Sequence, residues 1–202
     1  MTRRKTGKLT IALILTGVLL ILSALAIAVI GISLEKTAEK NAAEIADRIG
    51  ALLPESKNAE PDDRADKRMA SVSIDGVDFC AIIEIPRFGT KLPVRSVWDS
   101  SSVRMYPCRY SGSVHDSTLI IGGSDARGQF DFVSEITERD ILLVTDTEGK
   151  CHSYEVGRID ITQSADTPTL TEGEYSLVLF ARNTYGDGYT VIRCEKRAKT
   201  NA

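Results

Sequence analysis

The chain has 202 residues, which is enough for one or two domains, and a near-neutral charge balance. Apolar residues make up 43% of the sequence and charged residues 26%, both close to globular averages. The formal net charge of −3 excludes a strongly basic surface. Nucleic acid is therefore not expected as a partner.

The N-terminal segment has the pattern of a membrane anchor. Four lysines and arginines within residues 1–8 precede an uncharged run over residues 9–34. This run exceeds the ~20 residues that cross a ~30 Å hydrocarbon core as a helix. The pattern predicts a cytoplasmic tail, a single-pass helix in the cell membrane and an extracellular remainder. The alternative is a signal peptide cleaved near Ser23–Ala26, but signal-peptide apolar cores span only ~7–15 residues.

Residues 35–70 are expected to form a stalk and linker. Apolar residues recur at three- and four-residue spacing from Ala38 to Leu52, which predicts an amphipathic helix that Pro54 ends. Residues 55–68 are charged and lack aromatics, as a flexible spacer does. The helix is either a solvated spacer or a dimerisation element. Its apolar stripe is shorter than three or four heptads, which favours the spacer.

Residues 71–198 have the pattern of an all-β domain, followed by a tail over residues 199–202. Eight short runs rich in β-branched and aromatic residues predict strands, and turn formers such as Asp75-Gly76 separate them. About eight strands predict a barrel or sandwich, with one or two helical turns over residues 131–137. The runs are Val72–Ile74, Phe79–Ile85, Leu92–Val97, Thr118–Ile121, Ile141–Thr145, Tyr154–Ile161, Ser176–Ala181 and Tyr189–Arg193.

Several motifs follow one another along this domain. They are I-E-I-P-R-F-G-T-K-L-P-V (Ile83–Val94), P-C-R-Y-S-G-S (Pro107–Ser113), T-L-I-I-G-G-S-D (Thr118–Asp125), Q-F-D-F-V (Gln129–Val133), L-V-L-F-A-R (Leu177–Arg182) and V-I-R-C-E (Val191–Glu195). In this order and spacing they resemble the sortases, Gram-positive cysteine transpeptidases that anchor proteins to the cell wall, and clostridial-type members in particular. The resemblance covers residues 77–197 and implies a sortase-like β-barrel.

The same resemblance replaces all three catalytic residues of the family. Ser124 stands at the position of the catalytic histidine, Arg182 at the nucleophilic cysteine and Tyr189 at the catalytic arginine. Thiol-based acyl transfer needs a thiolate, an acid for the leaving amine and a cation for the oxyanion. Serine is no acid near neutral pH, arginine has no lone pair with which to attack, and tyrosine carries no charge. The three residues are therefore candidates for a peptide-binding groove without transpeptidase chemistry.

A relocated nucleophile is the alternative. The chain has four cysteines: Cys80, Cys108, Cys151 and Cys194. Cys151 adjoins His152, but neighbours on one strand point to opposite faces. Cys108 with His115 is the pair considered for a retained transpeptidase or hydrolase activity, and it requires a separation of ~2.6–3.2 Å. Buried free thiols are the default expectation, although disulfides are possible outside the cell.

Other site types have little support. Gly122–Ala126 is close to the G-x-S-x-G elbow of α/β-hydrolases, but the downstream pattern lacks alternating helices. Asp140, Asp146 and Glu148 lack the spacing of a calcium loop, and a hairpin turn explains the last two. Two histidines and the absence of C-x-x-C disfavour a zinc site, so no metal and no cofactor are expected.

Three functional hypotheses follow. The favoured one is an extracytoplasmic pseudo-sortase that binds a sorting-signal peptide, with the Arg182 cation favouring an anionic guest such as a carboxylate. The second is a scaffold for a neighbouring sortase or a pilin. The third is an enzyme that uses Cys108 and His115.

Overall fold

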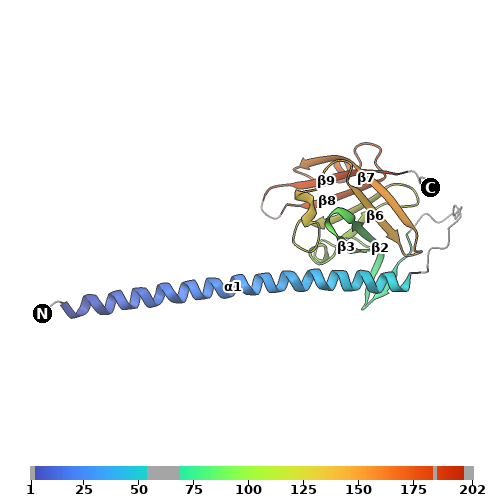
Figure 1. The fold of residues 1–202 in the computed structure, drawn as a ribbon. Coiled ribbons are helices and arrows are strands. Elements are labelled where there is room, and N and C mark those ends of the chain that lie inside the picture. Colours follow the sequence, from blue (N-terminus) through green and yellow to red (C-terminus); the bar gives the residue numbers. More distant parts are fainter. Residues whose placement is uncertain (1–2, 54–68, 184–185, 198–202) are drawn as a thin grey trace. The chain divides into compact units, whose positions relative to one another are not determined.

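A computed structural model describes residues 3–53, 69–183 and 186–197 (Figure 1). A long helix, α1 (Arg3–Leu52), precedes a β domain, and the chain divides into two compact units, residues 1–37 and 38–202. In the part of the chain that the structure describes, no helix is both long and apolar enough to cross a membrane. The predicted linker over residues 55–68 and the predicted tail over residues 199–202 lie outside the described residues.

The β domain contains nine strands. All eight predicted runs form strands, and β4 is an additional one. The prediction of an all-β barrel is therefore confirmed, with one strand more than expected. The strands are β1 (Val72–Ile74), β2 (Val77–Ile85), β3 (Thr90–Arg95), β4 (Cys108–Ser111), β5 (Leu119–Ser124), β6 (Ile141–Asp146), β7 (Cys151–Thr162), β8 (Leu177–Arg182) and β9 (Tyr189–Lys196).

The strands form one sheet that closes on itself. Their order is β1-β2-β3-β4-β5-β8-β9-β7-β6, and an additional pairing of β6 with β2 completes the barrel. The β3–β4 and β5–β8 pairs are parallel and the others antiparallel. Because parallel strands need a long crossover, the chain between β5 and β8 contains β6, β7 and the short helix α2 (Thr167–Leu170).

The barrel interior is filled by alternate residues of each strand. Ile121 on β5, Leu179 on β8 and Ile192 on β9 belong to one continuous buried cluster. β5 and β8 are buried on both faces, and so is β2, almost without interruption from Phe79 to Ile85. Its outer face is covered as well, because α1 packs against it.

The C-terminal part of α1 belongs to the barrel unit. Ala46 and Ile49 pack against Ile74, Phe79 and Ile82 of the β1–β2 hairpin, and both helix residues are buried. Ion pairs Asp47–Lys91 and Arg48–Asp75, at 2.9 and 2.8 Å, flank this contact. The predicted helix is confirmed, but the expected solvated spacer over this segment is wrong. The short apolar stripe is long enough to cover one hairpin.

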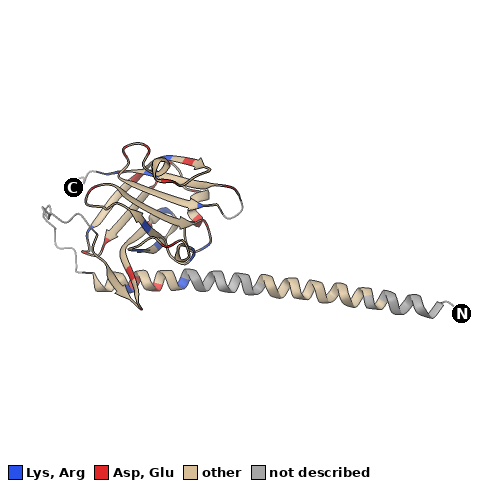
Figure 2. Ribbon diagram, turned by 180° about the vertical axis from the view of Figure 1, so that it is seen from behind, with Lys and Arg blue, Asp and Glu red and all other residues tan. Residues whose placement is uncertain are grey.

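Short helical turns and polar turns complete the fold. The helical turn predicted near residue 131 is η3 (Asp131–Ser134), and η1 (Pro86–Phe88) and η2 (Ser102–Arg104) were not predicted. The predicted hairpin turn after β6 is confirmed, because Asp146 accepts hydrogen bonds from the backbone N–H groups of Glu148 and Lys150. Lys and Arg are interspersed with Asp and Glu over the barrel (Figure 2).

Candidate functional site

Three neighbouring strands bring the predicted site residues side by side. Ser124 ends β5, Arg182 ends β8 and Tyr189 begins β9. Ser124 is paired with Arg182 across the parallel ladder, and Arg182 is paired with Tyr189 across the antiparallel one. Residues paired in this way point to the same face of a sheet. The three side chains therefore share the outer face at one end of the barrel.

Ser124 and Arg182 line a pocket of about 550 Å³, here called the arginine pocket. Tyr189 is not among the lining residues. The sequence prediction missed Arg104, which ends η2 and reaches the pocket from the β3–β4 connection. The arginine pocket is lined by Ser100, Val103, Arg104, Gly123, Ser124, Ala126, Arg182, Asn183 and Gly186.

Two glycines before Ser124 allow aromatic rings to press on both faces of β5. A Cβ atom at Gly122 would lie 2.4 Å from ring atoms of Trp98 and Phe180, and one at Gly123 would lie 2.6 Å from the Phe130 ring. The G-G-S segment thus serves close packing within a strand. The chain continues into a loop and the single turn η3. It lacks the strand-to-helix turn of a nucleophile elbow, so the hydrolase alternative has no structural support.

An aromatic cluster covers the outer face of β5 and β8 next to the arginine pocket. The Trp98 ring lies 5.3 Å from Tyr110 and 5.4 Å from Phe180, and Tyr189 lies 6.3 Å from Phe180. At the opposite end of the same two strands, a pocket of about 390 Å³ has Ile120 among its lining residues. This second pocket combines apolar side chains with hydroxyls and the carboxylate of Glu174, so the two ends of this face differ in charge.

The structure does not bring Cys108 and His115 together. The Cys108 thiol is buried 3.3 Å from the Tyr106 carbonyl, and burial raises its pKa. His115 is exposed, with its ring 6.3 Å from the ring of His152. No hydrogen bond joins Cys108 and His115 within residues 69–183. The alternative nucleophile–base pair of the sequence analysis is therefore wrong, because the Cys108 side chain is fully enclosed whereas His115 is exposed in the loop after β4.

Cys151 and His152 point to opposite faces of β7, as predicted. Cys151 is exposed, whereas His152 is buried with Nε2 2.9 Å from Oδ2 of Asp146. Burial alone would raise the pKa of Asp146, but hydrogen bonds from His152 and from backbone amides lower it. All four cysteines are free thiols, and burial raises the pKa of Cys80 to about 12.

Comparison with known proteins gives a structural match only. No family model matches the sequence, and no curated protein matches it. Sortase A from Corynebacterium diphtheriae superposes with a TM-score of 0.55 over 84% of this chain and 86% of its own, at 17% identity. Sortase C1 from Streptococcus agalactiae gives 0.53 over 63% and 72%, at 20% identity. Sortase C from Clostridium perfringens SM101 gives 0.50 over 60% and 71%, at 16% identity. This chain has the sortase fold.

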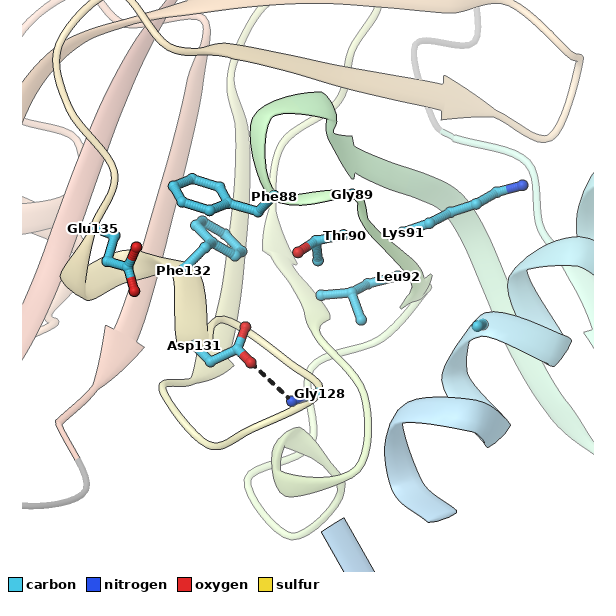
Figure 3. Close-up of a pocket in the computed structure, with 10 residues that line it drawn as sticks. Phe88, Gly89, Thr90, Lys91, Leu92, Gly128, Asp131, Phe132 and Glu135 are labelled. Carbon is cyan, nitrogen blue, oxygen red and sulfur yellow. Dashed lines mark hydrogen bonds between the residues drawn. The ribbon is translucent and has the colours of Figure 1, made fainter. Parts of the chain in front are cut away.

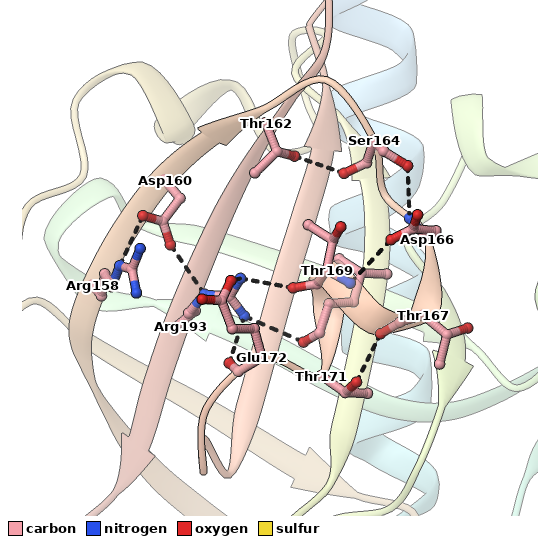
Figure 4. A network of polar contacts seen from close by, with 11 residues as sticks. Arg158, Asp160, Thr162, Ser164, Asp166, Thr167, Thr169, Thr171, Glu172 and Arg193 are labelled. Atoms are coloured by element: carbon pink, nitrogen blue, oxygen red, sulfur yellow. Dashed lines mark hydrogen bonds and ion pairs between the residues drawn. The ribbon is translucent and has the colours of Figure 1, made fainter.

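A buried arginine stabilises the wall of this sortase fold beside the aromatic cluster. Arg193, on the outer face of β9, is 1% exposed. Its guanidinium donates to Asp160 at 3.0 Å and to the carbonyls of Thr169, Leu170 and Glu172 at 2.8 to 3.3 Å (Figure 4). The connection between β7 and β8 is thereby fastened to the sheet. The signal in the sequence was a lone arginine inside a buried strand, a position that requires partners.

A pocket of opposite charge lies on another part of the sortase fold. It measures about 360 Å³ and combines Phe88 and Phe132 with the carboxylates of Asp131 and Glu135 (Figure 3). Lys91 at its edge pairs with Asp47 at 2.9 Å. The residues that the structure describes include no group of three or more side chains that could hold a metal ion.

Proposed function

We propose that this chain is a membrane-anchored, extracytoplasmic sortase-like protein that binds a peptide and lacks transpeptidase activity. The observation that carries the proposal is the side-by-side placement of three residues: Ser124 at the end of β5, Arg182 at the end of β8 and Tyr189 at the start of β9. Motif alignment assigns these positions to the catalytic residues of sortases. Residues at the positions of a former catalytic set must lie together on one face, and these three do.

The chemistry of the three side chains supports binding over acyl transfer. Arg182 remains protonated and has no electron pair for attack on a carbonyl, and the Ser124 hydroxyl is hydrogen-bonded to the backbone N–H of Ala126. A solved structure of sortase C from Clostridium perfringens contains the C-terminal cell wall sorting motif, and it superposes with a TM-score of 0.51 at 13% identity. By analogy of fold, an extended peptide would lie over the half-buried Trp98, Tyr110 and Tyr189 side chains that cover β5 and β8, with its end beside Arg182.

The membrane anchor is proposed from the sequence. The uncharged run over residues 9–34 follows a basic N-terminus, which favours a cytoplasmic tail and an extracellular barrel. In the cell membrane, such a protein would meet peptides of secreted proteins at the cell surface.

Intact-mass and native mass spectrometry test this proposal directly. The full chain in detergent micelles is incubated with a pool of sorting-signal-like peptides. We expect no covalent adduct, peptide retained in native spectra, and weaker retention in Arg182→Ala. Arg197→Ala is the control, because it also removes one exposed cation. Arg197 lies beyond the end of β9, where its guanidinium pairs with Glu155 at 3.6 Å. The control variant should retain the peptide.

Two results would contradict the proposal. A covalent adduct mapped to one residue would show an active nucleophile. Absence of both adduct and retention would leave the scaffold function, in which the barrel contacts a neighbouring sortase or pilin, and crosslinking in cells would then identify that contact.

A further inference from the structure

The arginine pocket holds two cations and no carboxylate in its lining. Arg182 and Arg104 are both exposed, and neither takes part in an ion pair among the described residues. Asp125 and Asp187, the acidic residues next to the pocket in sequence, are not among its lining residues. A lining with two arginines and no carboxylate favours a negatively charged ligand.

The acidic residue on the same connection as Arg104 is engaged elsewhere. Asp99 accepts hydrogen bonds from the hydroxyls of Ser101 and Ser102 and lies 3.5 Å from Arg95. Hydrogen bonds from Ser102 and Ser101 lower the pKa of Asp99 to about 2, so the carboxylate stays ionised. Its charge therefore compensates Arg95, and the charge of Arg104 remains available to a ligand.

The neutral groups of the pocket are also hydrogen-bond donors. The Ser124 hydroxyl accepts from the backbone N–H of Ala126 at 3.3 Å, which leaves its own O–H free to donate. The Asn183 side-chain oxygen accepts from the Thr190 hydroxyl at 3.0 Å, which leaves its NH₂ group for another acceptor. Beside Ser124, the buried amide nitrogen of Gln129 has no partner among the described residues. Ser124 and Asn183 of the lining can therefore both donate to a ligand.

We infer that the arginine pocket binds an oxyanion, and that in the protein's own ligand this group is the carboxylate at the C-terminus of a peptide. The inference rests on the proposed function, in which the peptide lies along β5 and β8. A guanidinium matches the two oxygens of a carboxylate in a planar, bidentate arrangement. A volume of about 550 Å³ leaves room for the residues that precede the carboxylate in a peptide.

Matched peptides separate the contribution of the terminal carboxylate to binding from that of the rest of the peptide. The full chain, labelled with ¹⁵N in detergent micelles, is titrated with acetyl-tetraalanine as the free acid, with the same peptide as the C-terminal amide, and with inorganic phosphate. We expect the acid to bind roughly tenfold more tightly than the amide, because the amide lacks the charge-assisted hydrogen bonds. Arg182→Gln and Arg104→Gln should each weaken acid binding about tenfold and leave amide binding unchanged. Arg197→Gln, which removes one exposed charge elsewhere, should change neither.

The outcomes distinguish this inference from the proposed function. Equal affinity for acid and amide, unaffected by the two arginine variants, would overturn the carboxylate site and leave peptide binding intact. Binding of phosphate alone, dependent on both arginines, would replace the peptide carboxylate with an inorganic oxyanion and also remove support for peptide binding. An equal loss of affinity for the acid in Arg197→Gln would show that net charge alone attracts the peptide, and it would overturn the site.

Discussion

Arg193 shows how this barrel accommodates a buried cation. The side chain is almost fully enclosed, yet its donors meet one carboxylate and three backbone carbonyls. The guanidinium also lies 5.8 Å from the centre of the Tyr175 ring. Burial of an unpaired charge is very costly, so these contacts are required for the arginine to be tolerated at all.

Replacing Arg193 with methionine is predicted to destabilise the domain. Arg193→Met fills a similar volume but leaves the carbonyls of Thr169 and Leu170 without a donor, so the free energy of unfolding should fall by about 3 kcal/mol. Arg158→Met is the matched control, because Arg158 donates to the same Asp160 at 2.8 Å from an exposed position. Its cost should be much smaller, because an exposed ion pair contributes little to stability. Urea unfolding measures both, and equal losses would show that the buried network adds nothing.

At the residue scale, the sequence predicted two of the charged and polar residues that line the arginine pocket and missed the others. Ser124 and Arg182 were found because motif order along the chain assigns them to known positions. Arg104 and Asn183 were missed because they belong to connections, where no periodic pattern constrains the residue type. The alternative pair of Cys108 and His115 was wrong because the sequence does not show which thiols the folded chain encloses.

At the element scale, eight strands could be predicted because each contains enough β-branched or aromatic residues to be recognised on its own. Strand β4 escaped prediction because its sequence, C-R-Y-S, contains a single strong β-former and is followed by Gly112. It forms through tertiary pairing with β5 and β3. Likewise, the burial of α1 on β2 depends on the hairpin that it meets, which no local pattern reveals.

The contact of α1 with the barrel gives the second stability prediction. Ile49 is 1% exposed against the β1–β2 hairpin, whereas Leu52, on the same helix, is 62% exposed. Ile49→Ala in the unit over residues 38–202 should lower the free energy of unfolding by about 2 to 4 kcal/mol, because it leaves a cavity. Leu52→Ala should change it by less than about 0.5 kcal/mol. Chemical unfolding measures the free energy of unfolding of both variants. Similar losses in the two would show that the helix does not pack on the barrel in solution.

At the scale of the whole molecule, the barrel was predictable because motif order carries long-range information that single elements lack. Parallel pairing of β5 with β8, across the intervening β6 and β7, has no local signature, yet it places Ser124 beside Arg182. The order and pairing of the strands thus determine both the fold and the position of the site. In the proposed membrane-anchored protein, the N-terminal charges would determine on which side of the membrane the barrel lies, and this proposal calls for a test of its own.

The native cysteines provide that test without any engineered label. Cys151 is exposed, whereas Cys80, Cys108 and Cys194 are buried with thiol pKa values that burial raises. Because the thiolate is the reactive form, a membrane-impermeant maleimide should modify Cys151 alone. Intact cells that produce the full chain should therefore be labelled once, and Cys151→Ser should abolish the signal. A membrane-permeant maleimide on the same cells confirms that the thiol is reduced. Labelling by the impermeant reagent only after lysis would place the barrel in the cytoplasm, where the proposed encounter with secreted peptides could not occur.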